Sequence, residues 1–382
     1  MVKDKKLTLI VQSLAMGGAE IFLGDLIVEL QKTGWQIKVY STNKEWNKWL
    51  ADHKIEAKYL LVVIDITGNW KGLVKACFFF PYAIYEYARI VWSNRNSTFL
   101  MSGFFEKTMV SLFAKLFKSK IVWIEFATLQ PLFKKFRGFS KWWYFLSISI
   151  PQKIITSSEH SYKLLIKDGL PKDKLIVIPC GRKIPRRSLW RHLSKLVKVI
   201  TNSQTLVCVS RLEPGKGQDL LIKAMPAVLK KFPRTQLQIV GKGNWRADLE
   251  HLAQELGITQ HVKFLGKVKN TFEIIDRATL VICSSVWELE GFGMVVIEAM
   301  ALGKPVVAFR SGPYPELIEH QKTGYLCQKG DVDDLAKGIK KLLVGQSLRN
   351  KLGKQAHRDF QKRFTIQAVT KEYASILNNY RS

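Results

Sequence analysis

Short apolar runs alternate with segments of helical periodicity along the 382 residues of the chain. In the first example, the apolar run 7–14 is followed by a turn at Gly17 and Gly18 and then by residues 19–33, whose apolar side chains recur at helical spacing. Gly34 follows where a helix C-terminal cap belongs. Strands that are separated by helices lie parallel in one sheet, with the helices on its faces. The alternation therefore predicts an α/β fold built on doubly wound parallel sheets.

The alternation occurs in two series, which indicates two domains. A chain of this length exceeds the size of one ordinary core. A loosely patterned and very basic segment at residues 181–202 separates the series and is the expected linker. We predict a Rossmann-like N-terminal domain over residues 1–185 and a Rossmann-like C-terminal domain over residues 186–364. Strands are expected to begin at Leu7, Gln36, Thr98, Lys120, Lys153 and Leu175 in the first series, and at Gln204, Gln236, His261, Thr279 and Pro305 in the second.

The chain is strongly basic, with a formal net charge of +29 from 60 Lys and Arg against 31 Asp and Glu, and the excess lies mainly in its first half. Between residues 115 and 145 the basic residues are interleaved with aromatic ones. Aromatic rings enter the headgroup layer of an anionic membrane while ammonium groups meet its phosphates. We therefore predict that the first domain docks on an anionic membrane. Nucleic-acid binding, for which no accompanying motif is present, and a solvated basic face are the alternatives. The predicted anchors are Lys134, Lys135, Arg137, Trp142 and Trp143.

Two apolar stretches, residues 77–92 and 142–151, are shorter than the ~20 apolar residues that a membrane-spanning helix needs. We expect neither to cross a bilayer, so the membrane contact would be peripheral. The first residues lack the pattern of a secretory signal. The five cysteines are scattered without a CxxC pair, which is typical of thiols in a reducing compartment. These features predict a cytoplasmic protein at the inner face of the plasma membrane.

The strongest chemical signal lies in residues 284–310. A strand is expected to end near Ser285, and a helix is expected to begin near Met294. A helix that begins after a strand and a glycine-containing loop directs free backbone N–H groups at a site where phosphates bind. Glu290 in the loop and Glu298 in the helix are separated by seven residues. Both carboxylates suit the paired hydroxyls of a hexose and a ribose, because each offers two acceptor oxygens.

This Glu-x7-Glu element, in its E-G-F-G…E-A setting, resembles the retaining family 4 glycosyltransferases of GT-B fold (glycosyl transferases group 1). The stretch 209–217 resembles the part of the family in which an Arg and a Lys clamp the donor diphosphate, here Arg211 and Lys216. Two fixed cations would neutralise the diphosphate and stabilise the charge that grows on the leaving group. The resemblance also implies two Rossmann-like domains that face a cleft, and a C-terminal helix over residues 365–382 that packs back on the first domain.

The resemblance assigns a donor site in the second domain and an acceptor site in the first. It implies catalytic roles for Arg211, Lys216 and Glu290, a backbone contact of Val268 with the base, and a turn that approaches the ligand closely at Gly17 and Gly18. The donor-binding residues expected on this basis are Gly17, Gly18, Arg211, Lys216, Gly241, Val268, Glu290, Gly291, Phe292, Gly293, Met294, Val295 and Glu298.

The resemblance implies no metal and no cofactor, because enzymes of GT-B fold generally hold the diphosphate with protein cations and a helix end. Asp331 and Asp333 form a possible metal-binding D-x-D pattern, but acids at the start of a helix favour an N-cap. The chain departs from the family at the cleft histidine, since Glu125 is followed by Phe126. Glu125 and His160 are the candidates for the acceptor side.

We therefore expect transfer of a hexose-type sugar from a nucleotide-sugar donor to a glycan or a lipid-linked acceptor, in the synthesis of a cell-envelope polysaccharide or glycolipid. Two rivals remain. One is another enzyme of GT-B fold, such as a nucleotide-sugar epimerase or a phosphorylase. The other is a basic nucleic-acid-binding protein, for which the charge of +29 is the argument.

Overall fold

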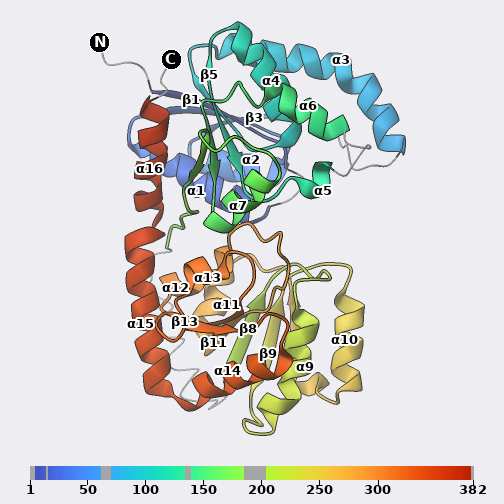
Figure 1. Cartoon of the computed structure of the whole chain (residues 1–382), viewed down its shortest axis with the longest axis vertical. Helices are drawn as coiled ribbons and strands as arrows, with labels where there is room; N and C mark the ends of the chain where they lie inside the picture. Colours follow the sequence, from blue (N-terminus) through green and yellow to red (C-terminus); the bar gives the residue numbers. More distant parts are fainter. Residues whose placement is uncertain (1–4, 14–15, 62–69, 134–138, 185–203, 380–382) are drawn as a thin grey trace. The chain divides into compact units, whose positions relative to one another are not determined.

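The computed structural model describes residues 5–13, 16–61, 70–133, 139–184 and 204–379, apart from the side chains of residues 70–78 and 139. The chain forms two compact units, one of Met1–Gly181 with Ile366–Ser382 and one of Arg182–Thr365. Each unit contains a sheet flanked by helices (Figure 1). The sequence places the transitions after residues 185 and 364, and most of the expected linker lies outside the described residues.

The first unit is built on a seven-stranded parallel sheet in the order β3-β2-β1-β4-β5-β6-β7. β1 pairs with β2 on one side and with β4 on the other, so the direction of winding reverses between β1 and β4. The strands are β1 (Lys6–Val11), β2 (Gln36–Ser41), β3 (Glu56–Tyr59), β4 (Thr98–Met101), β5 (Lys120–Glu125), β6 (Lys153–Thr156) and β7 (Leu175–Val177).

Helices cover both faces of this sheet. The C-terminal helix packs on α1, whereas α4 packs on α3 and on α6. Right-handed crossovers place α1 and α2 on one face and α3, α4 and α6 on the other. The helices are α1 (Gly18–Lys32), α2 (Lys44–Asp52), α3 (Trp70–Ser93), α4 (Phe104–Leu116), α5 (Gln130–Phe133), α6 (Phe139–Ser147), α7 (Glu159–Lys167) and α16 (Ile366–Asn379).

The second unit is built on a six-stranded parallel sheet in the order β10-β9-β8-β11-β12-β13. The winding reverses between β8 and β11, which pair with each other. Its middle strands are apolar on both faces, because helices cover both faces of a doubly wound sheet. The strands are β8 (Thr205–Val209), β9 (Gln236–Val240), β10 (Val262–Gly266), β11 (Leu280–Cys283), β12 (Val306–Phe309) and β13 (Gly324–Cys327).

Two groups of helices enclose the second sheet. α9 packs on α10 and α14, while α12 packs on α11 and α15. The core between α9, α14 and the sheet is formed by aliphatic side chains such as Leu221, Ile239 and Ile339. The helices are α9 (Gln218–Leu229), α10 (Arg246–Glu255), α11 (Thr271–Arg277), α12 (Met294–Ala301), α13 (Tyr314–Leu317), α14 (Val332–Val344) and α15 (Gln346–Arg363), with the 3-10 turn η2 (Thr259–His261) before β10.

The predicted fold class is confirmed, since both sheets are parallel and doubly wound. The structure adds two edge strands, β3 and β13, to those expected. No helix among the described residues combines the length and the apolar character that crossing a bilayer requires. Cys180, Cys208, Cys283 and Cys327 are buried free thiols, and the side chain of Cys77 lies outside the described residues.

Candidate functional site

The candidate site of the second unit lies where the winding of its sheet reverses. The chain leaves β8 toward α9 and leaves β11 toward α12, which lie on opposite faces of the sheet. In doubly wound sheets, ligands bind at the carboxyl ends of the strands at this reversal. The loop 210–217 follows β8, and the loop 284–293 follows β11. The residues with the strongest sequence signals are therefore brought together at this edge.

Glycines allow the two loops to meet. Gly217 has φ 69° and precedes α9, and a Cβ there would lie 1.8 Å from the backbone oxygen of Ser284. Backbone bonds join the loops, because Val286 N donates to Gly215 O at 3.0 Å. Gly293 has φ 101° and precedes α12. Only glycine occupies this backbone region without strain, so both helices begin with their first N–H groups uncovered by a side chain.

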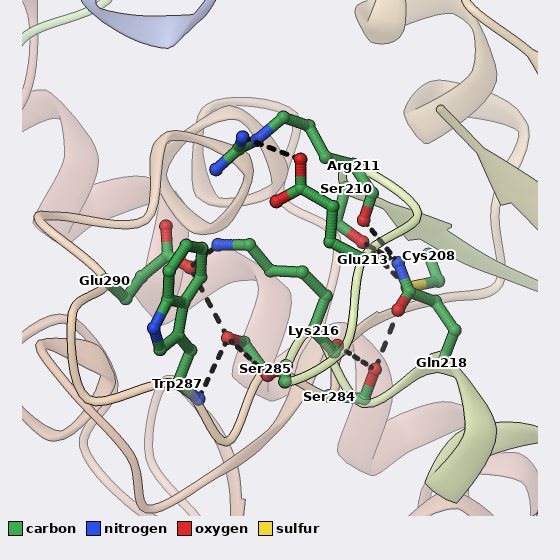
Figure 2. Close-up of polar contacts among 11 residues, drawn as sticks. Cys208, Ser210, Arg211, Glu213, Lys216, Gln218, Ser284, Ser285, Trp287 and Glu290 are labelled. Atoms are coloured by element: carbon green, nitrogen blue, oxygen red, sulfur yellow. Dashed lines mark hydrogen bonds and ion pairs between the residues drawn. The ribbon is translucent and has the colours of Figure 1, made fainter. Parts of the chain in front are cut away.

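Lys216 and Glu290 form the centre of the site. The Lys216 Nζ atom lies 2.6 Å from Glu290 Oε2, and Lys216 is only 7% exposed. Figure 2 shows the lysine side chain reaching from one loop to the carboxylate on the other, beside the indole of Trp287. Ser285 Oγ donates to the same Glu290 oxygen at 3.4 Å. A cation and a carboxylate are thus fixed side by side at the start of α12.

Arg211, the second predicted cation, lies near Lys216 but in a different environment. Its side chain is 63% exposed and pairs with Glu213, with Nη1 at 2.8 Å from Oε1. Both cations face the ring of Trp287, at 4.4 Å for Lys216 Nζ and 5.8 Å for the guanidinium carbon of Arg211. Such contacts attract cations to the ring face. Trp287 therefore gathers the positive charge of both side chains at one place.

Glu298 lies within α12 and is only 4% exposed. Arg182 Nε donates to its Oε1 at 3.0 Å, and Thr271 Oγ1 donates to its Oε2 at 2.9 Å. Both oxygens therefore have a protein donor. The predicted pair Glu290 and Glu298 is thus divided between two hydrogen-bonded groups, one around Lys216 and one around Arg182.

The other predicted donor-site residues of the second unit lie on the same loops and strand ends. Gly291 and Phe292 lie in the loop after β11, and the Phe292 ring packs against Phe364, with ring centroids 6.0 Å apart. Met294 and Val295 are the first residues of α12, at positions whose N–H groups have no partner within a helix.

Two further predicted residues follow the neighbouring strands of this sheet. Gly241 follows β9, and a Cβ there would lie 1.9 Å from Ser210 O, so glycine lets this strand end approach the loop after β8. Val268 follows β10 and lies three residues before the start of α11 at Thr271. Val268 is half-buried.

Several residues of the site were not predicted from the sequence. Gln218 ties the first loop together, because its Nε2 donates to Ser210 Oγ and to Arg211 O, both at 2.7 Å. Trp287 and Arg182 were also missed. Gln218 could have been predicted, because a polar residue in the first turn of a helix that follows a glycine is well placed to bind the preceding loop. Arg182 is distant in sequence from every motif, and only the fold brings it to Glu298.

The predicted residues of the first unit lie at the carboxyl ends of β1, β5 and β6. Gly17 is the N-cap of α1 with an extended backbone, φ −135°, and its N–H donates to Glu20 Oε2 at 2.8 Å. Gly18 is the first residue of α1 and is exposed. His160 lies in the first turn of α7, which Ser158 caps by accepting from Ser161 N.

Glu125 lies in the interior of the first unit. It is 5% exposed, and its Oε1 lies 2.6 Å from Lys107 Nζ and accepts from the Tyr144 hydroxyl at 2.7 Å. Burial lowers the pKa of Lys107, although the Glu125 carboxylate opposes this shift. Burial raises the pKa of Tyr144. Glu125 is therefore one member of a buried ion pair, which was not foreseen from the sequence.

The acids at the start of α14 form a cap, as predicted. Asp331 is the N-cap residue, and its Oδ1 accepts from Asp334 N at 2.9 Å. Asp333 lies in the first helical turn, where a carboxylate interacts favourably with the helix dipole. Over the part of the chain that the structure describes, no group of three or more His, Cys, Asp or Glu side chains is arranged to hold a metal ion.

Known protein families and sequences resemble parts of this chain. A model of the family "Glycosyl transferases group 1" matches residues 195–359. An uncharacterized glycosyltransferase of Haemophilus influenzae is 29% identical over 234 residues, which cover 61% of this chain and 63% of that protein. A GDP-mannose-dependent alpha-(1-6)-phosphatidylinositol monomannoside mannosyltransferase of Mycobacterium tuberculosis is 37% identical over 148 residues, 37% of this chain and 38% of that protein. The chain thus spans less than two thirds of the length of these relatives.

Solved structures match over nearly the whole chain. Anabaena HepE in complex with UDP and glucose has a TM-score of 0.81 and 22% identity, covering 98% of this chain and 100% of that one. WaaG, a glycosyltransferase involved in lipopolysaccharide biosynthesis, has a TM-score of 0.71 and 15% identity, covering 97% and 99%. At these identities the likeness shows the fold alone. Residues 195–359 therefore belong to the glycosyl transferases group 1 family, and the chain as a whole has the two-unit GT-B fold.

Proposed function

We propose that the chain is a retaining family 4 glycosyltransferase that moves a hexose-type sugar from a nucleotide-sugar donor to a glycan or lipid-linked acceptor. The observation that carries the proposal is the contact between Lys216 and Glu290, 2.6 Å apart where the second sheet reverses its winding. A diphosphate is bound by a cation, and the hydroxyl groups of a sugar are bound by acceptors such as a carboxylate. In the donor the sugar is bonded directly to the diphosphate, so the cation and the acceptor must lie side by side. The pair offers both at the N-terminus of α12.

The chemistry follows from charge. When the bond between the anomeric carbon and the diphosphate breaks, the electron pair stays with the diphosphate, whose negative charge grows. Lys216 and Arg211, both beside Trp287, and the first N–H groups of α12 are placed to stabilise that charge. In the same-face mechanism expected for this family, the acceptor hydroxyl gives its proton to the donor phosphate. The protein's main tasks are then positioning and leaving-group stabilisation.

Relatives and structural neighbours suggest which donors to test. The name of one relative includes GDP-mannose, and that of another includes an N-acetyl-alpha-D-glucosaminyl group. One structural neighbour is a complex with UDP-glucose. We propose that one of these nucleotide classes is the donor of this chain. We also propose that protein cations hold its diphosphate without a metal.

We propose further that the first unit docks on the inner face of the plasma membrane. Of the anchors predicted, Trp142 is 57% exposed on α6, whereas Trp143 is half-buried and its Nε1 donates to Thr108 Oγ1 at 2.9 Å. Lys134, Lys135 and Arg137 lie outside the described residues. The packed helices α3, α4 and α6 add further exposed apolar side chains: Phe79, Tyr82, Tyr85, Trp92, Leu112, Leu116 and Leu146.

Isothermal titration with UDP, GDP and ADP, followed by their sugars, tests the donor proposal. One nucleotide should bind clearly more tightly than the others, and binding should raise the stability of the protein, by about 2.7 kcal/mol at 100 times the dissociation constant. Nuclear magnetic resonance of the product then reports the anomeric configuration, which should match that of the donor. Failure of every nucleoside diphosphate to bind would remove the proposal.

A further inference from the structure

The second carboxylate of the site, Glu298, is held by residues that no sequence motif includes. Arg182 Nε and Thr271 Oγ1 each donate to a different oxygen of Glu298, at 3.0 and 2.9 Å. The Glu298 side chain is 6% exposed and the Arg182 side chain 14%. Burying the Glu298 carboxylate alone would be unfavourable, and the Arg182 guanidinium compensates its charge. A buried ion pair contributes little to stability over an apolar pair of similar volume. The arrangement therefore needs another explanation.

Arg182 is anchored along its length. Its backbone N donates to Phe364 O at 2.9 Å, and it forms an isolated parallel bridge with Thr365. The first residue of the second unit is thereby joined to the last. Its guanidinium carbon lies 4.9 Å from the centre of the Phe272 ring. A side chain with so few remaining rotamers presents its N–H group in one direction.

Thr271 fixes the other oxygen from a different element. It is the first residue of α11, which Asn270 caps by accepting from Phe272 N. The segment that precedes it contains Val268, for which a contact with the base is expected. The hydrogen bond from Thr271 to Glu298 therefore connects α12 to the start of α11, which follows that segment.

The remaining acceptor capacity of Glu298 matches a vicinal diol. A carboxylate has about four acceptor positions, and these two donors occupy one on each oxygen. One position per oxygen is left for two neighbouring hydroxyls. We propose that Arg182 and Thr271 are positioning residues that orient the Glu298 carboxylate for both hydroxyls of a ribose. This inference rests on the proposed function, in which the ligand is a nucleoside diphosphate.

A cycle that combines ligand and protein changes tests this role. The dissociation constants of the preferred nucleoside diphosphate and of its 2′-deoxy and 3′-deoxy analogues are measured by calorimetry for wild type, Arg182→Gln, Arg182→Lys and Thr271→Val. Hydrogen bonds to a charged group predict that wild type loses about ten- to a hundredfold affinity for each deoxy analogue. In Arg182→Gln the ratio of affinities between the ribose ligand and each deoxy analogue should fall to a few. In Thr271→Val this ratio should fall more for one of the two deoxy analogues than for the other.

Arg246→Gln is the matched control. Arg246 Nε also donates to a glutamate, Glu250 Oε1, at 2.8 Å, and its guanidinium carbon lies 5.8 Å from the centre of the Phe264 ring. Arg246 lies on α10, which follows β9, whereas Glu298 lies on α12, which follows β11. Arg246→Gln should keep the discrimination of wild type. An equal loss of affinity for ribose and deoxyribose ligands in Arg182→Gln would make Arg182 merely structural and overturn the inference. If Arg182→Gln does not fold, Arg182→Lys and Thr271→Val decide the matter in the same way.

Two results with the wild-type protein distinguish this inference from the proposed function. Tight binding of the nucleoside diphosphate without discrimination between ribose and deoxyribose overturns the inference and leaves the donor proposal intact. No binding of any nucleoside diphosphate overturns both.

Discussion

At the scale of single residues, the contact between Lys216 and Glu290 has two functions that conflict. Each side chain satisfies the other at 2.6 Å, yet each is also expected to bind a part of the donor. A bound diphosphate competes with Glu290 for the ammonium, and sugar hydroxyls compete with Lys216 for the carboxylate. In the proposed function, the ion pair is therefore a preorganised arrangement whose partners are replaced by equivalent groups of the ligand.

Replacing Lys216 with Met tests this role. In the proposed function the ammonium stabilises charge that develops on the leaving diphosphate, so kcat/KM should fall by about a hundred- to a thousandfold. The unfolding temperature should change much less than activity does. Lys223→Met is the control, since Lys223 is exposed and only loosely paired with Asp219 at 3.8 Å. A Lys216→Met enzyme with wild-type kcat/KM would refute the clamp.

A second residue, Glu106, affects the pH dependence of stability. It is fully buried near the start of α4, and burial raises the pKa of its carboxyl from 4.5 to about 7, opposed in part by its own amide, by Lys107 and by the amide of Gln12. The folded chain therefore binds more protons than the unfolded chain between pH 4.5 and 7. The free energy of unfolding falls as the pH rises through this window.

Glu106→Gln should remove that dependence. The free energy of unfolding of Glu106→Gln minus that of wild type should increase by on the order of 2–3 kcal/mol from pH 4.5 to pH 8. Urea unfolding at a series of pH values measures this difference. The exposed Glu250→Gln serves as the reference, and a parallel pH profile for both variants and wild type would contradict the assignment.

The sequence was sufficient to predict that Lys216 and Glu290 lie at the same edge of the second sheet. Lys216 and Glu290 each lie between a strand and a helix, in a pattern that occurs at phosphate-binding sites. Arg182 and Lys107 could not be found in this way, because their partners are far away in the sequence. The sequence predicts Glu125 at the end of a strand, where it lies. Its burial depends on Lys107 of α4 and Tyr144 of α6, which are distant from it in the sequence.

At the scale of elements, the approach of the loops after β8 and β11 depends on Gly217. Gly217→Ala should both strain a backbone with φ 69° and push against Ser284 O, 1.8 Å from the new Cβ. Gly257→Ala is a matched control, because Gly257 has φ 65° and no atom within 4 Å of the new Cβ. Both variants should lose about 1–2 kcal/mol of stability from backbone strain.

Only Gly217→Ala should also lose affinity for the nucleoside diphosphate, by about tenfold if the shift of the loops breaks one hydrogen bond to the ligand. Calorimetry on both variants under the same conditions measures this difference. Equal affinity in the two variants would mean that the meeting of the loops does not shape the site.

Most elements could be predicted because buried parallel strands are continuous apolar runs. β3 and β13 were missed for different reasons. β3 is an edge strand of sequence EAKY that is mostly exposed, so it has no apolar run. β13 is fully buried, but it has only four residues, GYLC, between polar segments. Short edge strands depend on pairing with their neighbour rather than on their own pattern.

At the scale of the whole molecule, the excess of positive charge bears on metal dependence and on localisation. We expect activity to survive treatment with EDTA, because in the proposed function Lys216, Arg211 and the start of α12 supply the positive charge that a metal would supply at the diphosphate. Activity is measured with the preferred donor before and after chelation. Complete loss that Mg²⁺ or Mn²⁺ restores would contradict a metal-free clamp.

The surface of α3, α4 and α6 leads to a prediction about the membrane. Exposed apolar side chains on these helices, among them Trp92, Leu116 and Trp142, accompany the exposed Lys115 and Lys141. Rings that enter the headgroup layer bind independently of salt, whereas each basic residue near an anionic surface adds ~1 kcal/mol that salt screens. Sedimentation with phosphatidylglycerol vesicles should therefore show binding that weakens in high salt without disappearing.

Trp142→Ala should weaken the salt-resistant part of this binding by about tenfold, the loss expected from one large apolar side chain. Val344→Ala is the control, because Val344 is 61% exposed but lies on α14 of the second unit. Lys115→Gln together with Lys141→Gln should instead reduce the salt-sensitive part. Failure to bind either anionic or neutral vesicles at low salt would refute docking. Binding to DNA stronger than to vesicles, with a steep salt dependence, would favour a nucleic-acid partner for the same charge.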